Sequence, residues 1–305
     1  MLHGRHGHAR VAVLTVIPEE TEAVASELGP LFEIPGTGAS TPMSINDEGK
    51  YPLVLVQSTD RSNMPSMETV RDLLEDWRPE VVILVGVAGA IVRMEDDKLD
   101  GLHPGDVVGI EYVHYGEYAK RSAGKRFKRY LPMVHPSTEL ITRWARPISR
   151  QDWWTGDMLA LEGAGRTPHV EFGEIVSVEF VAGDASAEEQ RAIFAEYDHA
   201  VAVDMESAGV ARAIHRAHSS VHYCPVWLGI RGISDQTGVD EEAQALCDSG
   251  SNNAQRRSWK PTAATMAARF TKKLLQGMLS TARPPHEGDP GMTAWLKPAE
   301  IGGRE

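Results

Sequence analysis

The sequence has few of the features that mark disulfide-bonded, secreted or membrane proteins. Its 305 residues include only two cysteines, Cys224 and Cys247, too few for a disulfide framework or a four-thiolate zinc site. No apolar run approaches the roughly 20 residues that a transmembrane helix requires. The first ten residues lack the apolar core of a signal peptide. These absences predict a chain in a reducing, cytoplasmic setting that has no membrane partner.

Positive charge is also scarce. Lys and Arg total 31 against 43 Asp and Glu, which gives a formal net charge of −12. Nucleic acids attract positive surfaces, so we expect no nucleic-acid partner. A small anionic ligand is still compatible, because a local basic pocket can oppose the overall charge. The terminal histidines His3, His6 and His8 suggest metal binding, but a frayed terminus is the commoner outcome. We therefore predict no metal site and no cofactor.

Apolar runs of strand length alternate with helical patterns along the chain. Several runs are continuous rather than alternating, which is typical of strands covered on both faces. The strands are expected at residues 11–17, 53–56, 81–85, 107–110, 175–180, 201–203 and 226–230. Helical spacing of apolar residues covers residues 67–77 and 263–274. This order predicts a single α/β domain with a central mixed, mainly parallel sheet flanked by helices.

The expected domain covers residues 11–280, between a flexible N-terminus (1–10) and a loosely held tail (281–305). We expect an insertion at about residues 135–168, which is rich in tryptophan but has no clean period. A polar loop is expected at about residues 239–257, where Gly, Ser and Asn are frequent.

Two of the strand ends carry carboxylates. The segment VAVLTVIPEE (11–20) delivers Glu20 to the carboxyl end of a strand, where catalytic groups of open sheets gather. Acidic residues also favour helix N-termini because of the helix dipole, so this position has a structural explanation too. In VAVDMESAGVARA (201–213), Asp204 and Glu206 begin a largely apolar segment. Asp204 suits a helix N-cap, whereas capping explains Glu206 less well.

Two further segments bring polar or small residues to strand ends. VWLGIRGISD (226–235) delivers Arg231, Ser234 and Asp235, which suits either a general acid with orienting partners or a simple Ser-Asp turn. VGVAGA (85–90) has small residues that let the backbone approach a ligand closely. Its spacing is not that of a dinucleotide loop. The chain also contains no phosphate-binding P-loop and no G-x-S-x-G nucleophile motif.

Together these segments resemble the purine nucleoside phosphorylase and methylthioadenosine/adenosylhomocysteine nucleosidase superfamily, over about residues 11–275. The matching segments are VAVLTVIPEE, PEVVILVGVAGAI, PGDVVGIEYVHY, VAVDMESAGVARA and IRGISD. The resemblance implies one α/β domain around a mixed sheet. It also implies a homo-oligomer, since members of the superfamily assemble as dimers, trimers or hexamers.

The resemblance also implies catalytic roles. Asp235 falls on the acid that protonates the purine near N7, and Glu20 falls on the base that activates the attacking water. Glu206 would hold the ribose hydroxyls. These roles agree with the chemistry, because N-glycosidic cleavage passes through an oxocarbenium-like sugar. An acid must then serve the leaving base while a carboxylate serves the water, and Glu206 opposes the developing positive charge.

Further substrate contacts follow from the same resemblance. Met205 would pack against the sugar, Tyr115 lies near sugar-contacting positions, and Phe180 or Val181 would stack on the base. The remaining expected contacts are Ser234, Arg231, Val87, Ala88 and Gly89.

Hydrolysis is favoured over phosphorolysis. Bacterial phosphorylases of the superfamily grip phosphate with an Arg and a Ser where this chain has Leu84 and Val87. The chain also lacks their G-D-P-x-R pattern, and Glu20 would repel bound phosphate. We expect hydrolysis of a purine nucleoside or nucleotide, with adenine favoured as the base. The alternatives are a phosphate-dependent purine nucleoside phosphorylase and a non-catalytic nucleoside-binding sensor.

One basic run stands out in this acidic chain. Residues 120–129 contain six Lys or Arg side chains. The run suits a solvated loop, an oligomer contact, or a site for the phosphates of a nucleotide. In the last case the expected phosphate contacts are Lys125, Arg126, Lys128 and Arg129.

Overall fold

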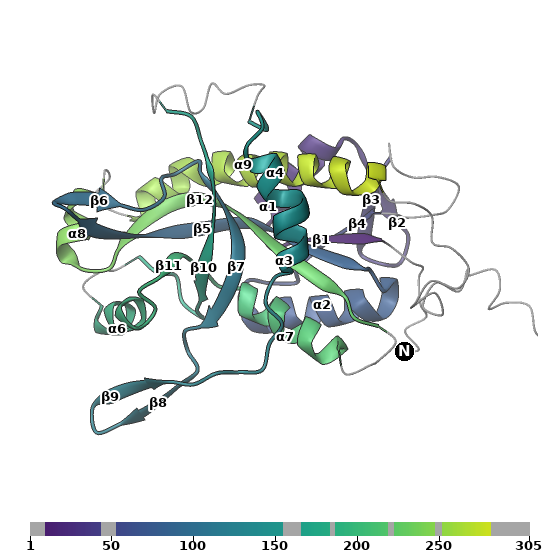
Figure 1. Ribbon diagram of the computed structural model, residues 1–305. Coiled ribbons are helices and arrows are strands. Elements are labelled where there is room, and N and C mark those ends of the chain that lie inside the picture. The colour runs from purple at the N-terminus through teal and green to yellow at the C-terminus, as the bar shows by residue number, and fades with distance from the viewer. Residues whose placement is uncertain are drawn as a thin grey trace, which may run out of the picture.

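The computed structural model describes residues 10–43, 53–154, 166–183, 187–218, 223–247 and 252–281, and Figure 1 shows their arrangement. The strands are β1 (Val11–Thr15), β2 (Leu31–Ile34), β3 (Ala39–Pro42), β4 (Leu53–Gln57), β5 (Val81–Glu95), β6 (Lys98–Asp100), β7 (Val107–Tyr115), β8 (Ala119–Ser122), β9 (Lys125–Lys128), β10 (Val170–Ser177), β11 (Ala200–Asp204) and β12 (Val226–Gly238). The α-helices are α1 (Pro18–Leu28), α2 (Asn63–Trp77), α3 (Thr138–Leu140), α4 (Arg146–Ser149), α6 (Glu188–Glu196), α7 (Ser207–Ala217), α8 (Glu241–Leu246) and α9 (Asn252–Thr281). A π-helical turn, η1 (Ile141–Ala145), joins α3 to α4.

The described strands form one mixed sheet and one separate hairpin. The sheet runs in the order β11-β10-β7-β12-β5-β1-β4-β3-β2, with β6 beside β5. The central pairs β1–β4, β1–β5, β5–β12, β7–β10 and β10–β11 are parallel. Antiparallel pairing joins β7 to β12 and β11 to the far end of β5. The predicted mixed, mainly parallel sheet is therefore confirmed.

Helices cover both faces of the sheet, which explains the continuous apolar runs. In β1, Ala12 and Leu14 pack toward α2 and α7, whereas Val11 and Val13 pack toward α1 and α9. Because successive side chains of a strand point to opposite faces, a strand covered on both sides needs apolar residues at every position. On α2, the side chain of Trp77 is only 1% exposed and is among the largest fully buried side chains of the core.

Two strands extend well beyond their apolar starts and carry the site. β5 and β12 remain paired from Val81↔Val226 to Val92↔Gly238, with a register shift between Ile233 and Asp235. The VGVAGA segment is thus strand rather than loop, because a long parallel neighbour supplies its backbone hydrogen bonds. The shift is a β-bulge, a feature that redirects side chains near binding sites.

The segment expected as a polar loop at about residues 239–257 contains helix. The Asp240 side chain accepts a hydrogen bond from the Ala243 amide at 2.9 Å and so caps α8, and α9 begins at Asn252. Within the expected insertion, Trp153 is buried and packs edge-on against Phe270 of α9, with ring centroids 5.4 Å apart. Residues 155–165 of the insertion lie outside the described residues, as do 1–9 and 282–305.

The basic run forms the β8–β9 hairpin, which projects from the body of the molecule (Figure 1). Ala123 and Gly124 take positive φ values of 51° and 71° at its tip, the conformation of a tight hairpin turn. No helix in the described part of the chain is both long and apolar enough to cross a membrane.

Candidate active site

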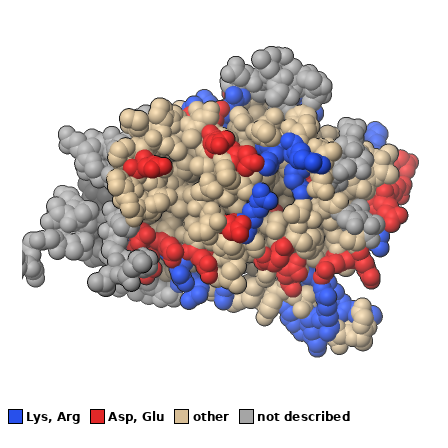
Figure 2. Space-filling view, turned by 180° about the vertical axis from the view of Figure 1, so that it is seen from behind, with Lys and Arg blue, Asp and Glu red and all other residues tan. Residues whose placement is uncertain are grey.

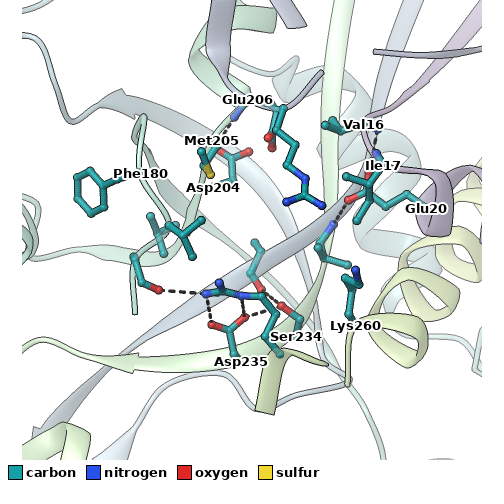
Figure 3. Close-up of a pocket in the computed structure, with 18 residues that line it drawn as sticks. Val16, Ile17, Glu20, Phe180, Asp204, Met205, Glu206, Ser234, Asp235 and Lys260 are labelled. Atoms are coloured by element: carbon teal, nitrogen blue, oxygen red, sulfur yellow. Dashed lines mark hydrogen bonds and ion pairs between the residues drawn. The ribbon is translucent and has the colours of Figure 1, made fainter. Parts of the chain in front are cut away.

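A cleft opens where the ends of β1, β5, β11 and β12 meet. It encloses about 750 Å³, counting its open mouth. Figure 3 shows its lining. The lining residues are Val16, Ile17, Glu20, Arg61, Val87, Ala88, Gly89, Phe180, Val181, Ala182, Val203, Asp204, Met205, Glu206, Ser234, Asp235, Arg256 and Lys260. They come from segments far apart in the sequence, brought together by the order of the strands.

Glu20 lies in the first turn of α1, just after β1. Its Oε2 accepts hydrogen bonds from the amides of Val16 (2.8 Å) and Ile17 (3.1 Å), which closes the N-terminus of the helix. Its Oε1 accepts a third from the Val87 amide at 2.9 Å. Burial raises the pKa of Glu20, against the opposing effects of Arg231 and the three amides. A raised pKa brings a carboxylate nearer the value that suits a general base at neutral pH.

Asp204 and Glu206 share a buried arginine. Arg231 donates to Asp204 Oδ2 from Nε (3.1 Å) and Nη2 (2.7 Å), and Nη2 also donates to Glu206 Oε2 at 2.9 Å. Asp204 also accepts from the amide of Ser207, the first residue of α7, at 3.2 Å. The N-cap position of α7 is Glu206, however, so the expected N-cap at Asp204 was wrong by two residues. Asp204 therefore has a structural role, and Arg231 holds Glu206 in position from behind the cleft.

The environment of Glu206 strongly perturbs its pKa. Burial raises its pKa to about 7, with the charges of Asp204 and Glu20 adding to the effect and Arg231 opposing it. Its Oε1 accepts the Ser62 amide at 3.3 Å. Glu206 therefore changes charge in the neutral pH range.

Arg231 also faces Glu20. The Nη1 atom of Arg231 is buried and makes no hydrogen bond with any described residue. A Cβ added at Gly86 would clash with both Arg231 Nη1 and Glu20 Oε1. Only glycine, which has no Cβ, lets these two side-chain atoms lie beside the backbone at this position. One donor and one acceptor thus point into the same small space.

Asp235 follows the bulge in β12 and is held from two sides. Its Oδ1 accepts from Ser234 Oγ at 2.5 Å and from Arg256 Nε at 3.1 Å, and its Oδ2 accepts from Arg256 Nη2 at 2.7 Å. Arg256 Nη2 also donates to the Ala182 carbonyl at 3.1 Å. Arg256 thereby ties Asp235 to the segment that contains Phe180 and Val181.

Most of the side chains predicted from the sequence lie in this cleft. Those that line it are Glu20, Val87, Ala88, Gly89, Phe180, Val181, Met205, Glu206, Ser234 and Asp235. Arg231 lies behind them. Tyr115 lines a neighbouring hollow with Met67, where its hydroxyl donates to Glu179 at 2.9 Å.

The basic hairpin does not line the cleft. Arg126 pairs with Glu196 and the Gly116 carbonyl, and Lys128 lies 4.4 Å above the Tyr197 ring. Figure 2 shows the basic side chains of the hairpin gathered at one corner, separate from those on the body of the molecule. None of the expected phosphate contacts Lys125, Arg126, Lys128 and Arg129 therefore lines the cleft within one chain, although Arg126 lies beside Gly116, next to Tyr115.

Three cations that line the cleft were not expected from the sequence: Arg61, Arg256 and Lys260. Arg256 and Lys260 are four residues apart on α9, a spacing that places both on one helix face. Arg61 lies in the loop after β4, so the strand-end rule that selected Glu20 applies to it as well. Among the described residues, no group of three or more His, Cys, Asp or Glu is arranged to hold a metal ion.

The family model of the phosphorylase superfamily matches residues 10–276 of the chain. The chain therefore belongs to the phosphorylase superfamily. No curated protein matches the chain.

Solved structures share the fold at low sequence identity. The 5′-methylthioadenosine/S-adenosylhomocysteine nucleosidase of Neisseria meningitidis, in complex with methylthio-immucillin-A, is 19% identical with a TM-score of 0.62, over 88% of this chain and 99% of that one. The corresponding nucleosidase of S. pneumoniae is 18% identical with a TM-score of 0.61, over 87% and 98%. The futalosine hydrolase of Helicobacter pylori is 16% identical with a TM-score of 0.60, over 89% and 98%. By name, two of these relatives are nucleosidases and the third is a hydrolase, and their fold is the fold of this chain.

Proposed function

We propose that the protein hydrolyses the N-glycosidic bond of a purine nucleoside or nucleotide, with adenine as the favoured base. The observation that carries this proposal is that Glu20, Glu206 and Asp235, from three distant segments, line one cleft. Each has different partners, so each is suited to a different task. The nucleosidase names of two structural relatives support the same reaction class.

Asp235 serves the leaving base. The base lies against Phe180 and Val181. Asp235 takes a proton from solvent and passes it to purine N7 as the C1′–N9 bond breaks. The bonding electron pair moves into the purine, which leaves neutral because of that proton. Ser234 and Arg256 hold the carboxyl group in place, and Arg256 also links it to the wall that receives the base.

Glu206 serves the ribose. Its carboxylate accepts hydrogen bonds from the ribose hydroxyls while Met205 packs against the sugar ring. As the bond breaks, positive charge develops on the ring, and a fixed negative charge nearby stabilises it. Arg231 and the Ser62 amide keep the Glu206 side chain from turning away.

Glu20 serves the nucleophile. A water molecule between Glu20 Oε1 and Arg231 Nη1 has an acceptor for one proton and a donor to fix its orientation. Glu20 takes a proton from this water as its oxygen bonds to C1′, which yields the free sugar. The unpartnered Nη1 beside the space left by Gly86 supports this position.

Two observations favour water over phosphate as the nucleophile. Leu84 is fully buried in the core, so it does not reach the cleft. The Val87 amide is already hydrogen-bonded to Glu20, and a carboxylate at this position repels an anionic nucleophile. A phosphate-dependent phosphorylase and a non-catalytic nucleoside sensor are the alternatives. The cytoplasmic location and homo-oligomeric assembly stay predictions from the sequence.

The test is a substrate panel. The purified protein is incubated with adenosine, methylthioadenosine, adenosylhomocysteine, AMP and ATP, and free base is measured by chromatography. We expect adenine from at least one of them. Nucleoside binding without any released base would support the sensor alternative and contradict the proposal.

A further inference from the structure

The cleft has a cationic end that the proposed chemistry does not use. Arg61 and Lys260 both line it, in a protein whose net charge is −12. Lys260 pairs with Glu19, and this hydrogen bond holds the pKa of Glu19 below its ordinary value, with Arg61 near enough to contribute. Both cations thus lie near Glu19, and only Lys260 is paired with it.

Arg61 is available to a ligand. Its side chain is exposed, and its guanidinium makes no hydrogen bond or ion pair with any described residue. By contrast, Arg256 is committed to Asp235 and Ala182. A guanidinium on the wall of a cleft, with five donors unused, is suited to an anionic oxygen group.

The loop that carries Arg61 is fixed to the ribose end of the cleft. Ser62, the next residue, donates its amide to Glu206, and the Ser62 hydroxyl donates to Glu179. Ser62 takes a φ of 93°, a conformation rare for a residue with a side chain, which the surrounding contacts maintain. The backbone of Arg61 is therefore held next to Ser62, the residue that contacts Glu206, the carboxylate assigned to the ribose hydroxyls.

Lys260 completes this end from the other wall. Figure 3 shows Lys260 on the Glu20 side of the cleft, away from Phe180. Phe180 and Asp235 belong to the base end, and Glu206 and Glu20 hold the hydroxyls and C1′. A ribose held in this way has C5′ left to carry a further group, and Arg61 and Lys260 are the cations of the cleft that the proposed chemistry leaves to receive it.

We propose that Arg61 and Lys260 form a subsite for a phosphate carried on the 5′ carbon of the substrate, so that the protein prefers nucleotides to nucleosides. This inference rests on the proposed function, whose substrate class it narrows. Free phosphate is the other source of the same chemistry. The 5′ group is favoured because the amides of Val16, Ile17 and Val87 are already bonded to Glu20 and so do not serve a free phosphate beside C1′.

The test compares two matched double variants, R61Q/K260Q in the cleft and K125Q/R129Q on the hairpin, each losing one Arg and one Lys. The measured quantity is kcat/KM for AMP divided by kcat/KM for adenosine. Each lost charge-assisted contact weakens binding about tenfold, so we expect this ratio to fall about 100-fold in R61Q/K260Q. In K125Q/R129Q we expect the wild-type ratio. An equal ratio in wild type and R61Q/K260Q, or a fall in the hairpin variant alone, overturns the subsite.

Two further arms separate the explanations. If added inorganic phosphate accelerates adenosine cleavage and R61Q/K260Q loses that acceleration, the cations serve a free phosphate, and the proposal is overturned. If wild type releases no base from either substrate, the proposed function fails, and calorimetry then tests the subsite alone. Binding of AMP at least tenfold tighter than adenosine, lost in R61Q/K260Q, supports it; equal binding of both overturns it.

Discussion

Replacing Glu206 by glutamine tests the buried charge cluster at the centre of the cleft. The side chain has a pKa of about 7 in the folded chain against an ordinary value of 4.5, because it is buried beside Asp204 and Glu20. The folded state thus keeps the Glu206 proton at pH values where the unfolded chain has lost it. The contribution of Glu206 to the unfolding free energy is therefore fully present below pH 4.5 and is lost as the pH rises through 7.

The size of the effect follows from the two values. The difference between pKa 4.5 and about 7 corresponds to about 3 kcal/mol of unfolding free energy, of which roughly 2.5 kcal/mol falls between pH 5 and pH 8.5. Glutamine cannot ionise, so the unfolding free energy of E206Q does not fall in this way as the pH rises. The variant gives up one acceptor, toward Ser62 or Arg231, which adds a penalty that is independent of pH.

Urea unfolding of wild type and E206Q at pH 5, 6, 7, 8 and 8.5 gives the comparison directly. The other titrating groups are common to both proteins, so the difference between their unfolding free energies reports Glu206 together with the buried charges that interact with it. We expect this difference to move by about 2.5 kcal/mol in favour of E206Q as the pH rises. Parallel curves for the two proteins would refute the assignment of a raised pKa to Glu206.

The remaining predictions concern Gly86, Asp235 and Arg256. Gly86→Ala places a Cβ against Arg231 and Glu20, which are both buried, so we expect a loss of about 1–3 kcal/mol in thermal unfolding and a large fall in kcat. The control Gly277→Ala, whose Cβ would lie 3.6 Å from Trp144, should unfold at or above the wild-type temperature, and equal effects would contradict the clash. Asp235→Asn keeps the shape of the side chain but cannot transfer the proton, so base release should slow by about 10²-fold or more. Circular dichroism should show that the fold is retained. A near-wild-type rate would show that another group is the acid. Arg256→Gln should lower kcat with less effect on stability than Gly86→Ala, since Arg256 is partly exposed; unchanged turnover would remove it from the account.

The fold was predictable because its core strands are covered on both faces. Residues 11–14, 53–56 and 81–85 are apolar at successive positions, and each run pairs in parallel with its neighbour as that pattern indicates. The later parts of β5 and β12 were not predictable in this way. Gly86 and Gly232 have low strand propensity, and they are strand only because two long neighbours pair across the sheet.

The candidate site was predictable where strand ends carry carboxylates. Glu20 and Glu206 follow apolar strands, and Asp235 follows the apolar start of β12 within the same strand, so the order of the strands brings all three together. Arg256 and Lys260 were missed because the first turns of α9 face the cleft rather than the core. Those turns are consequently polar and resemble a loop in sequence, and apolar periodicity becomes clear only from about Ala263.

The role of the basic hairpin shows a limit of charge patterning. A run of cations indicates a positive surface but not its position, and here β8 and β9 pair only with each other and lie apart from the cleft. Arg61, a single arginine in a loop of mixed charge, lines the cleft instead. Position relative to the sheet decides which cation meets the ligand, and that position depends on contacts such as the one between Ser62 and Glu206.

The most direct measurement of the central claim is the identity of the sugar product in buffer without phosphate. Purified protein is incubated with adenosine or AMP, and adenine and the sugar are quantified together by chromatography. We predict one free ribose or ribose 5-phosphate for each adenine, at a rate that added phosphate does not increase. Adenine release that requires phosphate and yields a sugar phosphorylated at C1′ would contradict the assignment of Glu20 to an attacking water.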